Sequence, residues 1–275
     1  MTHRAAAVPA TTLRPRHQRR SILASVRPSA NAANRASRPH RAPPATIPPP
    51  MTTTRGLVAL GDSITNGHGE PALGVHPQSW AQWLAEALEL PFTKLAADGA
   101  LATDVLREQV PRLNGPYDVG CVYVGVNDAR VPAFDPPAYE RDLRAIADAV
   151  GAASERLVLC TIPGDLGRPR AAPKPRIASA IVRRVAAERG ATVVALDDLA
   201  GPPWLLPDAV HPTAVGQLEI ADRAARALGA PRLPSSTVEV HDSRRARARF
   251  AARFGVMLAS DLRRRAVERL QAQSL

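Results

Sequence analysis

The chain has 275 residues, 45% of them hydrophobic, so it can bury a full core, and no apolar run approaches the length of a membrane span. Its formal charge of +11 is unevenly spread: +9 over residues 1–50, −4 over residues 51–231 and +6 over residues 232–275. This distribution removes the simplest argument for a nucleic-acid-binding or membrane-binding body, and it predicts three parts, an N-terminal extension, one globular domain and a basic C-terminal segment.

Residues 1–50 are rich in Arg, Pro and Ala and lack a periodic apolar pattern, so we expect them to be disordered. The run from Arg19 to Leu23 resembles a twin-arginine export signal, but Arg27 interrupts the apolar region that should follow it. The absence of acids is typical of a transit peptide, whereas the proline density is not. Met51 directly precedes the first predicted strand, so a start site placed too far upstream is the further alternative. Because neither targeting signal is complete, we expect a cytoplasmic protein.

The globular part alternates between strands and helices. Short apolar runs predict strands at 57–60, 92–96, 119–124, 157–162 and 192–196. Apolar residues at helical spacing predict helices at 79–88, 103–110, with Thr103 as the cap, 139–150, 177–189 and 213–228. Strands of near-continuous apolar residues between helices indicate a parallel sheet covered on both faces. Right-handed crossovers then bring every strand-to-helix loop to one edge.

The first strand runs directly into Gly61-Asp62-Ser63, a tight turn at that edge. Ligands bind beyond the carboxyl ends of parallel strands, which makes the hydroxyl of Ser63 a candidate nucleophile. Taken alone, the same serine is more commonly a helix cap or a turn residue. The choice between these interpretations depends on what the other loops carry.

Four further residues occupy those loops: Gly99, Asn127, Asp208 and His211. His211 could remove the proton of Ser63, and Asp208, three residues before it, could fix the tautomer of its ring. The amide of Asn127 and the backbone N–H of Gly99 are hydrogen-bond donors suited to an oxyanion. Each residue alone has an ordinary explanation as a turn or cap residue, but only catalysis explains why they converge.

These residues stand in four ordered blocks: Gly61-Asp62-Ser63, Gly99, Gly125-Val126-Asn127-Asp128 and Asp208-Ala209-Val210-His211-Pro212. The set resembles the sequence blocks of the SGNH hydrolases, also called GDSL esterases. The resemblance covers about residues 55–229. It implies Ser63 as nucleophile, Asp208 and His211 as its partners, and the amides of Ser63, Gly99 and Asn127 as the oxyanion hole. It also implies a three-layer α/β/α flavodoxin-like sandwich with a five-stranded parallel sheet. Ile64 follows the first block where the family has Leu, and the residues around Gly99 match the family's second block only loosely.

The function predicted is hydrolysis of acyl or acetyl esters through an acyl-enzyme, without a metal or organic cofactor. Cys121 and Cys160 lie inside apolar runs and lack metal-ligand spacing, so we expect buried thiols. Short loops favour a small-molecule ester. Trp204 is a candidate substrate-pocket residue, although packing of its loop is the commoner role, and Arg168 with its neighbour Arg170 could bind an anionic substrate or simply be solvated.

The C-terminal segment predicts two basic amphipathic helices, at 244–258 and 262–270. They could touch nucleic acid or a membrane surface, but packing against the body or a partner subunit is more common. The alternative function is therefore a non-catalytic SGNH-like domain whose basic termini bind an anionic partner. A flavodoxin-like nucleotide binder is disfavoured because no Gly-rich phosphate loop follows the first strand.

Overall fold

The computed structural model describes residues 55–167 and 171–273, with side chains to residue 267. The chain divides into Met1–Pro50 and Met51–Leu275, and every described residue belongs to the second unit. The predictions made for residues 1–50, and those for Arg168 and Arg170, concern positions outside the described residues.

A parallel sheet forms the centre of this unit, with the strand order β2-β1-β3-β4-β5. Its strands are β1 (Leu57–Gly61), β2 (Phe92–Lys94), β3 (Tyr117–Tyr123), β4 (Ser154–Cys160) and β5 (Thr192–Val194). The order turns back between β1 and β3, which is where a doubly wound sheet opens a crevice at the carboxyl ends of its strands. The predicted five-stranded parallel sheet is confirmed.

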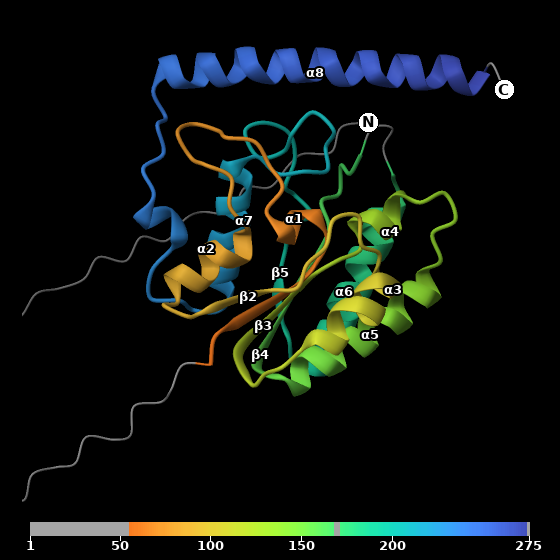
Figure 1. Ribbon diagram of the computed structural model, residues 1–275, viewed down its shortest axis with the longest axis vertical. Coiled ribbons are helices and arrows are strands. Elements are labelled where there is room, and N and C mark those ends of the chain that lie inside the picture. The colour runs from red at the N-terminus through yellow and green to blue at the C-terminus, as the bar shows by residue number, and fades with distance from the viewer. Residues whose placement is uncertain (1–54, 168–170, 274–275) are drawn as a thin grey trace, which may run out of the picture. The chain divides into compact units, whose positions relative to one another are not determined.

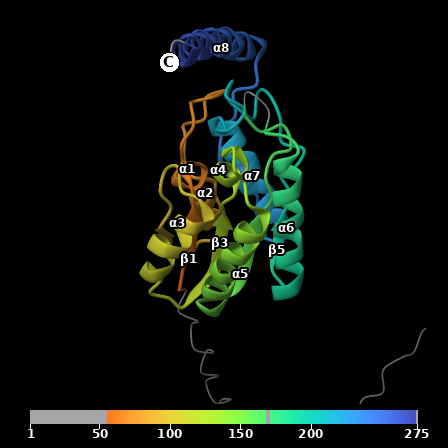
Figure 2. The ribbon, with the colours of Figure 1, turned by 90° about the vertical axis from the view of Figure 1, so that its right-hand side faces the viewer.

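Helices cover both faces of the sheet (Figure 1). The longer ones are α2 (Trp80–Ala87), α5 (Pro136–Ala152), α6 (Lys174–Arg189) and α7 (Ala214–Ala227), and the short ones are α1 (Ser63–Asn66), α3 (Ala102–Asp104) and α4 (Val126–Arg130). Helices α2 and α7 pack together on one face, and α5 and α6 pack together on the other (Figures 1 and 2). The predicted three-layer sandwich is therefore confirmed.

The predicted helix at 103–110 differs from the observed structure. Helix α3 covers only three residues and continues as a π-helical turn, η1 (Val105–Gln109), and a 3-10 turn, η2 (Val110–Arg112). Pro111 has no N–H group and cannot extend an α-helix, which explains the irregular end. Thr103 lies inside the helix, and the cap position is Leu101, whose N–H donates to Asp104 at 3.0 Å.

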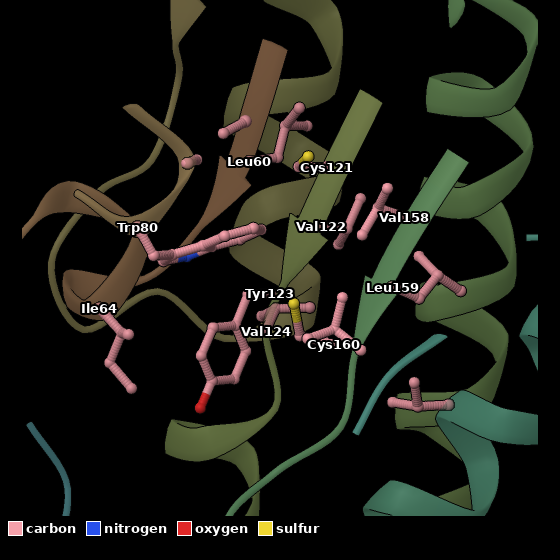
Figure 3. Packing of buried hydrophobic residues seen from close by; sticks show 14 of the residues in the cluster. Leu60, Ile64, Trp80, Cys121, Val122, Tyr123, Val124, Val158, Leu159 and Cys160 are labelled. Atoms are coloured by element: carbon pink, nitrogen blue, oxygen red, sulfur yellow. The ribbon is translucent and has the colours of Figure 1, made fainter. Parts of the chain in front are cut away.

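The core lies between the sheet and its helices (Figure 3). All five residues of β1 are buried, as its continuous apolar pattern indicated. The rings of Trp80 and Tyr123 meet edge to face with centroids 6.4 Å apart, an arrangement that adds to the stability gained by burial. Cys121 and Cys160 are buried free thiols, and burial raises the pKa of both.

The C-terminal segment forms one helix rather than two. After the short turn η3 (Pro234–Thr237), helix α8 (Arg244–Gln273) runs without a break through the predicted gap at 259–261. No Pro or Gly interrupts those positions, and Asp261 accepts hydrogen bonds from Arg264 and Arg265 one turn later. Within the described residues, no helix is both long and apolar enough to cross a bilayer.

Candidate active site

The turn after β1 is built so that only glycine fits its first position. Gly61 has φ +149°, and a Cβ there would lie 2.1 Å from the carbonyl oxygen of Tyr123 on β3. The buried amide of Gln109, on the π-helical turn, donates to the carbonyl of Gly61 at 2.8 Å and accepts from its N–H at 2.9 Å. These contacts fix the point at which the chain leaves the sheet for Ser63.

Ser63 is the first residue of α1, and Asp62 is the N-cap. The backbone N–H of Ser63 therefore has no partner within the helix. Gln217 of α7 donates to the carbonyl of Ile64 within α1 and to that of His68 just after it, both at 2.9 Å. The nucleophile candidate thus sits on a short helix that is tied to α7.

Ser63, His211 and Asp208 form a continuous chain of hydrogen bonds. Ser63 Oγ lies 3.0 Å from His211 Nε2, and His211 Nδ1 lies 2.7 Å from Asp208 Oδ2. The other carboxylate oxygen of Asp208 accepts the N–H groups of Val210 and His211. The structure therefore brings together the three residues predicted to react, although they are up to 148 positions apart.

The charge state of Asp208 suits this arrangement. Burial of the carboxyl acts to raise its pKa, but the bonds from His211 and from the backbone outweigh burial and hold the pKa below its usual value. An ionised Asp208 accepts a hydrogen bond from the Nδ1–H group of His211, which leaves Nε2 free to accept one from the Ser63 hydroxyl. This is the tautomer that a general base requires.

The oxyanion candidates come from the loops after the first three strands along the chain. Asn127 lies on α4, where its amide nitrogen donates to the carbonyl of Ala100 at 3.2 Å. Asp128 accepts the N–H of Ala102 with both carboxylate oxygens, at 3.1 and 3.3 Å. The loop that carries Gly99 is therefore tied to α4 by two neighbouring side chains.

Gly99 itself is exposed, with φ +74° and nothing within 4 Å of where a Cβ would be. Its backbone conformation, rather than a lack of space, is what favours glycine there. No hydrogen bond from its N–H to another backbone group is found in the described part of the chain.

Two carboxyl groups beside these residues were not singled out from the sequence. Asp62 is fully buried and caps α1 through Oδ1, which accepts from Ile64 at 2.9 Å, while Oδ2 has no hydrogen-bond partner among the described residues. Burial raises the pKa of Asp62 to about 7 and that of Asp128 to about 6. The sequence offers one indication of their importance, which is that each is adjacent to a catalytic candidate.

His68 is a further residue that the sequence prediction missed. Its Nε2 lies 2.8 Å from Asp98 Oδ2, and its ring is tilted 37° against that of His211 with centroids 5.9 Å apart. It follows α1 in the Gly-rich loop 66–69, so its position after the nucleophile turn was the available signal. Its proximity places a second imidazole beside the candidate base.

Trp204 packs its loop. The half-buried ring contacts two hydrophobic clusters, and its carbonyl oxygen accepts from Thr213, the N-cap of α7. Packing, the commoner of the two roles considered for this residue, accounts for these contacts. Among the residues that the structure describes, no group of three or more His, Cys, Asp or Glu is placed to hold a metal ion.

Comparisons with known proteins identify the family and the fold of this chain. The family model described as GDSL-like Lipase/Acylhydrolase matches residues 59–218, more than half of the chain. No match was found among curated protein sequences. Among solved structures, the fold is similar to LAE5, an alpha/beta hydrolase enzyme from the metagenome of Lake Arreo, Spain, with 21% identity, a TM-score of 0.52, and coverage of 65% of this chain and 96% of that one.

A variant of Axe2, an acetyl xylan esterase from Geobacillus stearothermophilus, is similar to the same extent, with 21% identity, a TM-score of 0.51, and coverage of 65% of this chain and 96% of that one. At this level of identity the two structures establish the shared fold. The N-terminal extension and α8 both lie outside the family match.

Proposed function

Because the chain belongs to the GDSL-like lipase and acylhydrolase family and is an ester hydrolase, we propose that it works through a Ser63–His211–Asp208 triad and an acyl-enzyme. The observation that carries the proposal is the unbroken chain of two hydrogen bonds, 3.0 and 2.7 Å, from the hydroxyl of Ser63 to the carboxylate of Asp208. A cap or turn serine has no need of such a chain.

In the first step, His211 Nε2 accepts the proton of Ser63 while Oγ attacks the acyl carbon. The carbonyl oxygen becomes an oxyanion, and the imidazolium is stabilised by ionised Asp208. Protonated His211 then donates its proton to the leaving alcohol, and the acyl group remains on Oγ.

The oxyanion is assigned to three donors, the N–H groups of Ser63 and Gly99 and the side-chain amide of Asn127. Asn127 reaches the site from the start of α4, and its bond to Ala100 fixes the amide plane. Donors positioned before the reaction stabilise the developing charge without reorganising.

In the second half, His211 removes a proton from water as the water attacks the acyl carbon, and then donates that proton to Ser63 Oγ as the bond from the acyl carbon to Oγ breaks and the acid leaves. Every proton transfer passes through His211, so no step requires a metal or organic cofactor. The cycle restores the hydroxyl of Ser63.

For substrate, we propose a small-molecule ester with a short acyl group. In the described part of the chain the loops after the strands carry no inserted domain, and one structural neighbour is an acetyl xylan esterase, which makes acetyl esters a natural first choice. The packing of Trp204 supports assigning it to the loop rather than to an acyl pocket.

The test is turnover of p-nitrophenyl acetate, butyrate and octanoate by the full chain and by Ser63→Ala, with Ser236→Ala as a matched control on the exposed turn η3. We expect Ser63→Ala to abolish turnover, Ser236→Ala to retain it, and acetate to be preferred. Equal rates for Ser63→Ala and wild type would overturn the triad, and a preference for octanoate would overturn the assignment of a short acyl group.

A further inference from the structure

Exposed large hydrophobic side chains are concentrated on α8. Six such residues are exposed in the described part of the chain, and four of them belong to this helix: Val256, Leu258, Leu262 and Val267. Val256 is 71% exposed and Leu262 58%, whereas the two elsewhere, Val131 and Ile177, are below 40%. A cluster of this kind marks an interaction surface more often than isolated apolar residues do.

The inner side of α8 already has a partner. Its half-buried residues recur every three or four positions and share one side of the helix: Ala246, Phe250, Phe254, Met257, Asp261 and Arg265. Phe250 packs into the smaller hydrophobic cluster of the body, and Arg253 forms an ion pair with Glu70. The helix lies across the end of the sandwich, over the loops after β1 and β5 (Figures 1 and 2).

The same side of α8 approaches the loop of the candidate triad. A cavity of about 410 Å³ is lined by Leu206, Pro207 and Asp208 from that loop and, from α8, by Val256, Met257, Ser260, Asp261 and Arg264. Val256 borders this cavity and is still 71% exposed. The inner contacts therefore hold α8 beside the active site and leave its outer face uncovered.

The outer face combines apolar and cationic groups. Small residues, Ala248, Ala252, Gly255, Ala259 and Ala266, alternate there with Val256, Leu262 and Val267, whereas Leu258 lies nearer the inner side of the helix. The side chains of Arg244, Arg245, Arg249 and Arg263 have no ion pair or hydrogen bond within residues 55–167 and 171–267, and Arg249 also borders a cavity between α8 and residues 71–76. Over its whole length α8 has nine Arg and two acids, a formal charge of +7.

Charge and apolarity together select among the occupants that could cover this face. A second copy of α8 would bring one +7 helix against another, which is unfavourable. A nucleic acid would pair with the arginines but leave Val256, Leu262 and Val267 in water. A bilayer containing anionic lipid offers phosphates to the arginines and an apolar layer to the Val and Leu side chains.

We propose that the outer face of α8 binds the surface of a membrane that contains anionic lipid. The helix lies in the interface, with Val256, Leu262 and Val267 inserted and the arginine side chains extended to the lipid phosphates. Because its inner side borders the same cavity as the loop of Asp208, binding would place the active site next to the lipid surface. This proposal does not depend on the triad being catalytic.

The experiment is co-sedimentation of the full chain with vesicles of phosphatidylcholine alone and of equal parts phosphatidylcholine and phosphatidylglycerol. We expect binding to the anionic vesicles that weakens with added salt, and little binding to the neutral ones. Each arginine near an anionic surface strengthens binding by roughly fivefold, so R245Q/R249Q/R263Q should weaken it by about a hundredfold.

Two sets of control variants separate charge from folding. R245K/R249K/R263K keeps the charge and should bind as wild type does. V256S/L262S/V267S should weaken binding by roughly tenfold or more because three apolar side chains no longer insert, whereas I177S, at an exposed position on α6, should not change it. Unchanged turnover of p-nitrophenyl acetate in solution, or an unchanged circular dichroism spectrum if the ester is not turned over, shows that each variant is folded.

Three results would overturn the proposal. The first is no binding to anionic vesicles, or equal binding to both kinds. The second is full retention of binding in V256S/L262S/V267S together with complete competition by a duplex DNA oligonucleotide, which would indicate a polyanion site. The third is a stable dimer of the full chain that V256S/L262S/V267S dissociates, which would indicate that a second copy covers this face.

Discussion

Replacing Asp62 with Asn should stabilise the protein at pH 8 and leave its stability nearly unchanged at pH 4. The side chain is fully buried, and only one of its carboxyl oxygens, Oδ1, has a hydrogen-bond partner among the described residues. Asn keeps that acceptor for the N–H of Ile64 and carries no charge. At pH 4 a protonated Asp62 and an Asn are close equivalents, because each places one unpaired polar group at the Oδ2 position.

The magnitude follows from the pKa. Burial raises the pKa of Asp62 from 3.8 to about 7 in the folded protein. Between those values the unfolded chain releases a proton that the native protein retains, so the wild type loses stability as the pH rises toward 7. About three pKa units at 1.36 kcal/mol each give a loss of roughly 4 kcal/mol by pH 8, which the Asn variant avoids.

The assay is urea unfolding of wild type and D62N at pH 4, 6 and 8, followed by circular dichroism. Similar denaturant slopes allow the midpoints to be compared directly. D135N is the matched control, because Asp135 is also an N-cap whose side chain accepts a backbone N–H, that of Ala138, but at the exposed start of α5. A stability difference between D62N and wild type that does not change with pH, or that favours wild type at pH 8, would refute the reasoning.

Three further outcomes are expected. N127A should lower kcat on p-nitrophenyl acetate by about a hundred- to a thousandfold with little change in KM, because a donor to the oxyanion is lost; a rise in KM alone would contradict this. D208N should lower kcat by up to about ten-thousandfold because the amide no longer selects the Nδ1–H tautomer of His211, and activity within tenfold of wild type would remove Asp208 from the triad. G61A should fail to accumulate as folded protein because its Cβ would meet a backbone oxygen at 2.1 Å, whereas G99A, with open space around it, should fold; soluble expression and circular dichroism compare the two.

Most of the fold could be predicted because the apolar pattern is simple. Five short apolar runs separated by helical periods allow few arrangements other than a parallel sheet covered on both faces. Boundaries were less accurate, since β4 begins three residues earlier than predicted and α6 also begins three residues earlier. The extra residues of β4 are polar, and pairing with β3 rather than burial places them in the strand. Those of α6 include the buried Pro175, which is suited to the first turn of a helix because the N–H it lacks would have no partner there.

The irregular structure after α3 could not be predicted in the same way. Residues 103–110 have a helical apolar period, but two features favour a π-helical turn. Pro111 cannot extend an α-helix, and the side chain of Gln109 forms two hydrogen bonds with the backbone of Gly61, which is 48 positions away. Local pattern carries no information about such a contact.

The central residues of the candidate site were predictable because parallel strands deliver their loops to one edge. Ser63, Asn127, Asp208 and His211 can therefore be identified from the sequence. Asp62 and Asp128 cannot, because their importance lies in burial, and burial of a turn carboxylate is set by the packing of distant elements. The continuity of α8 could not be predicted either, since two apolar groups separated by polar residues give the same pattern whether they belong to one helix or to two.

The most direct test of the account is whether Ser63 forms a covalent bond with an acyl-group mimic. The full chain would be treated with a fluorophosphonate, and the labelled peptide identified by mass spectrometry, alongside S63A and H211A. We predict one label on Ser63 in wild type, none in S63A, and much slower labelling in H211A because the base is lost. Labelling that persists in S63A, or an unlabelled wild type that still hydrolyses esters, would contradict the triad.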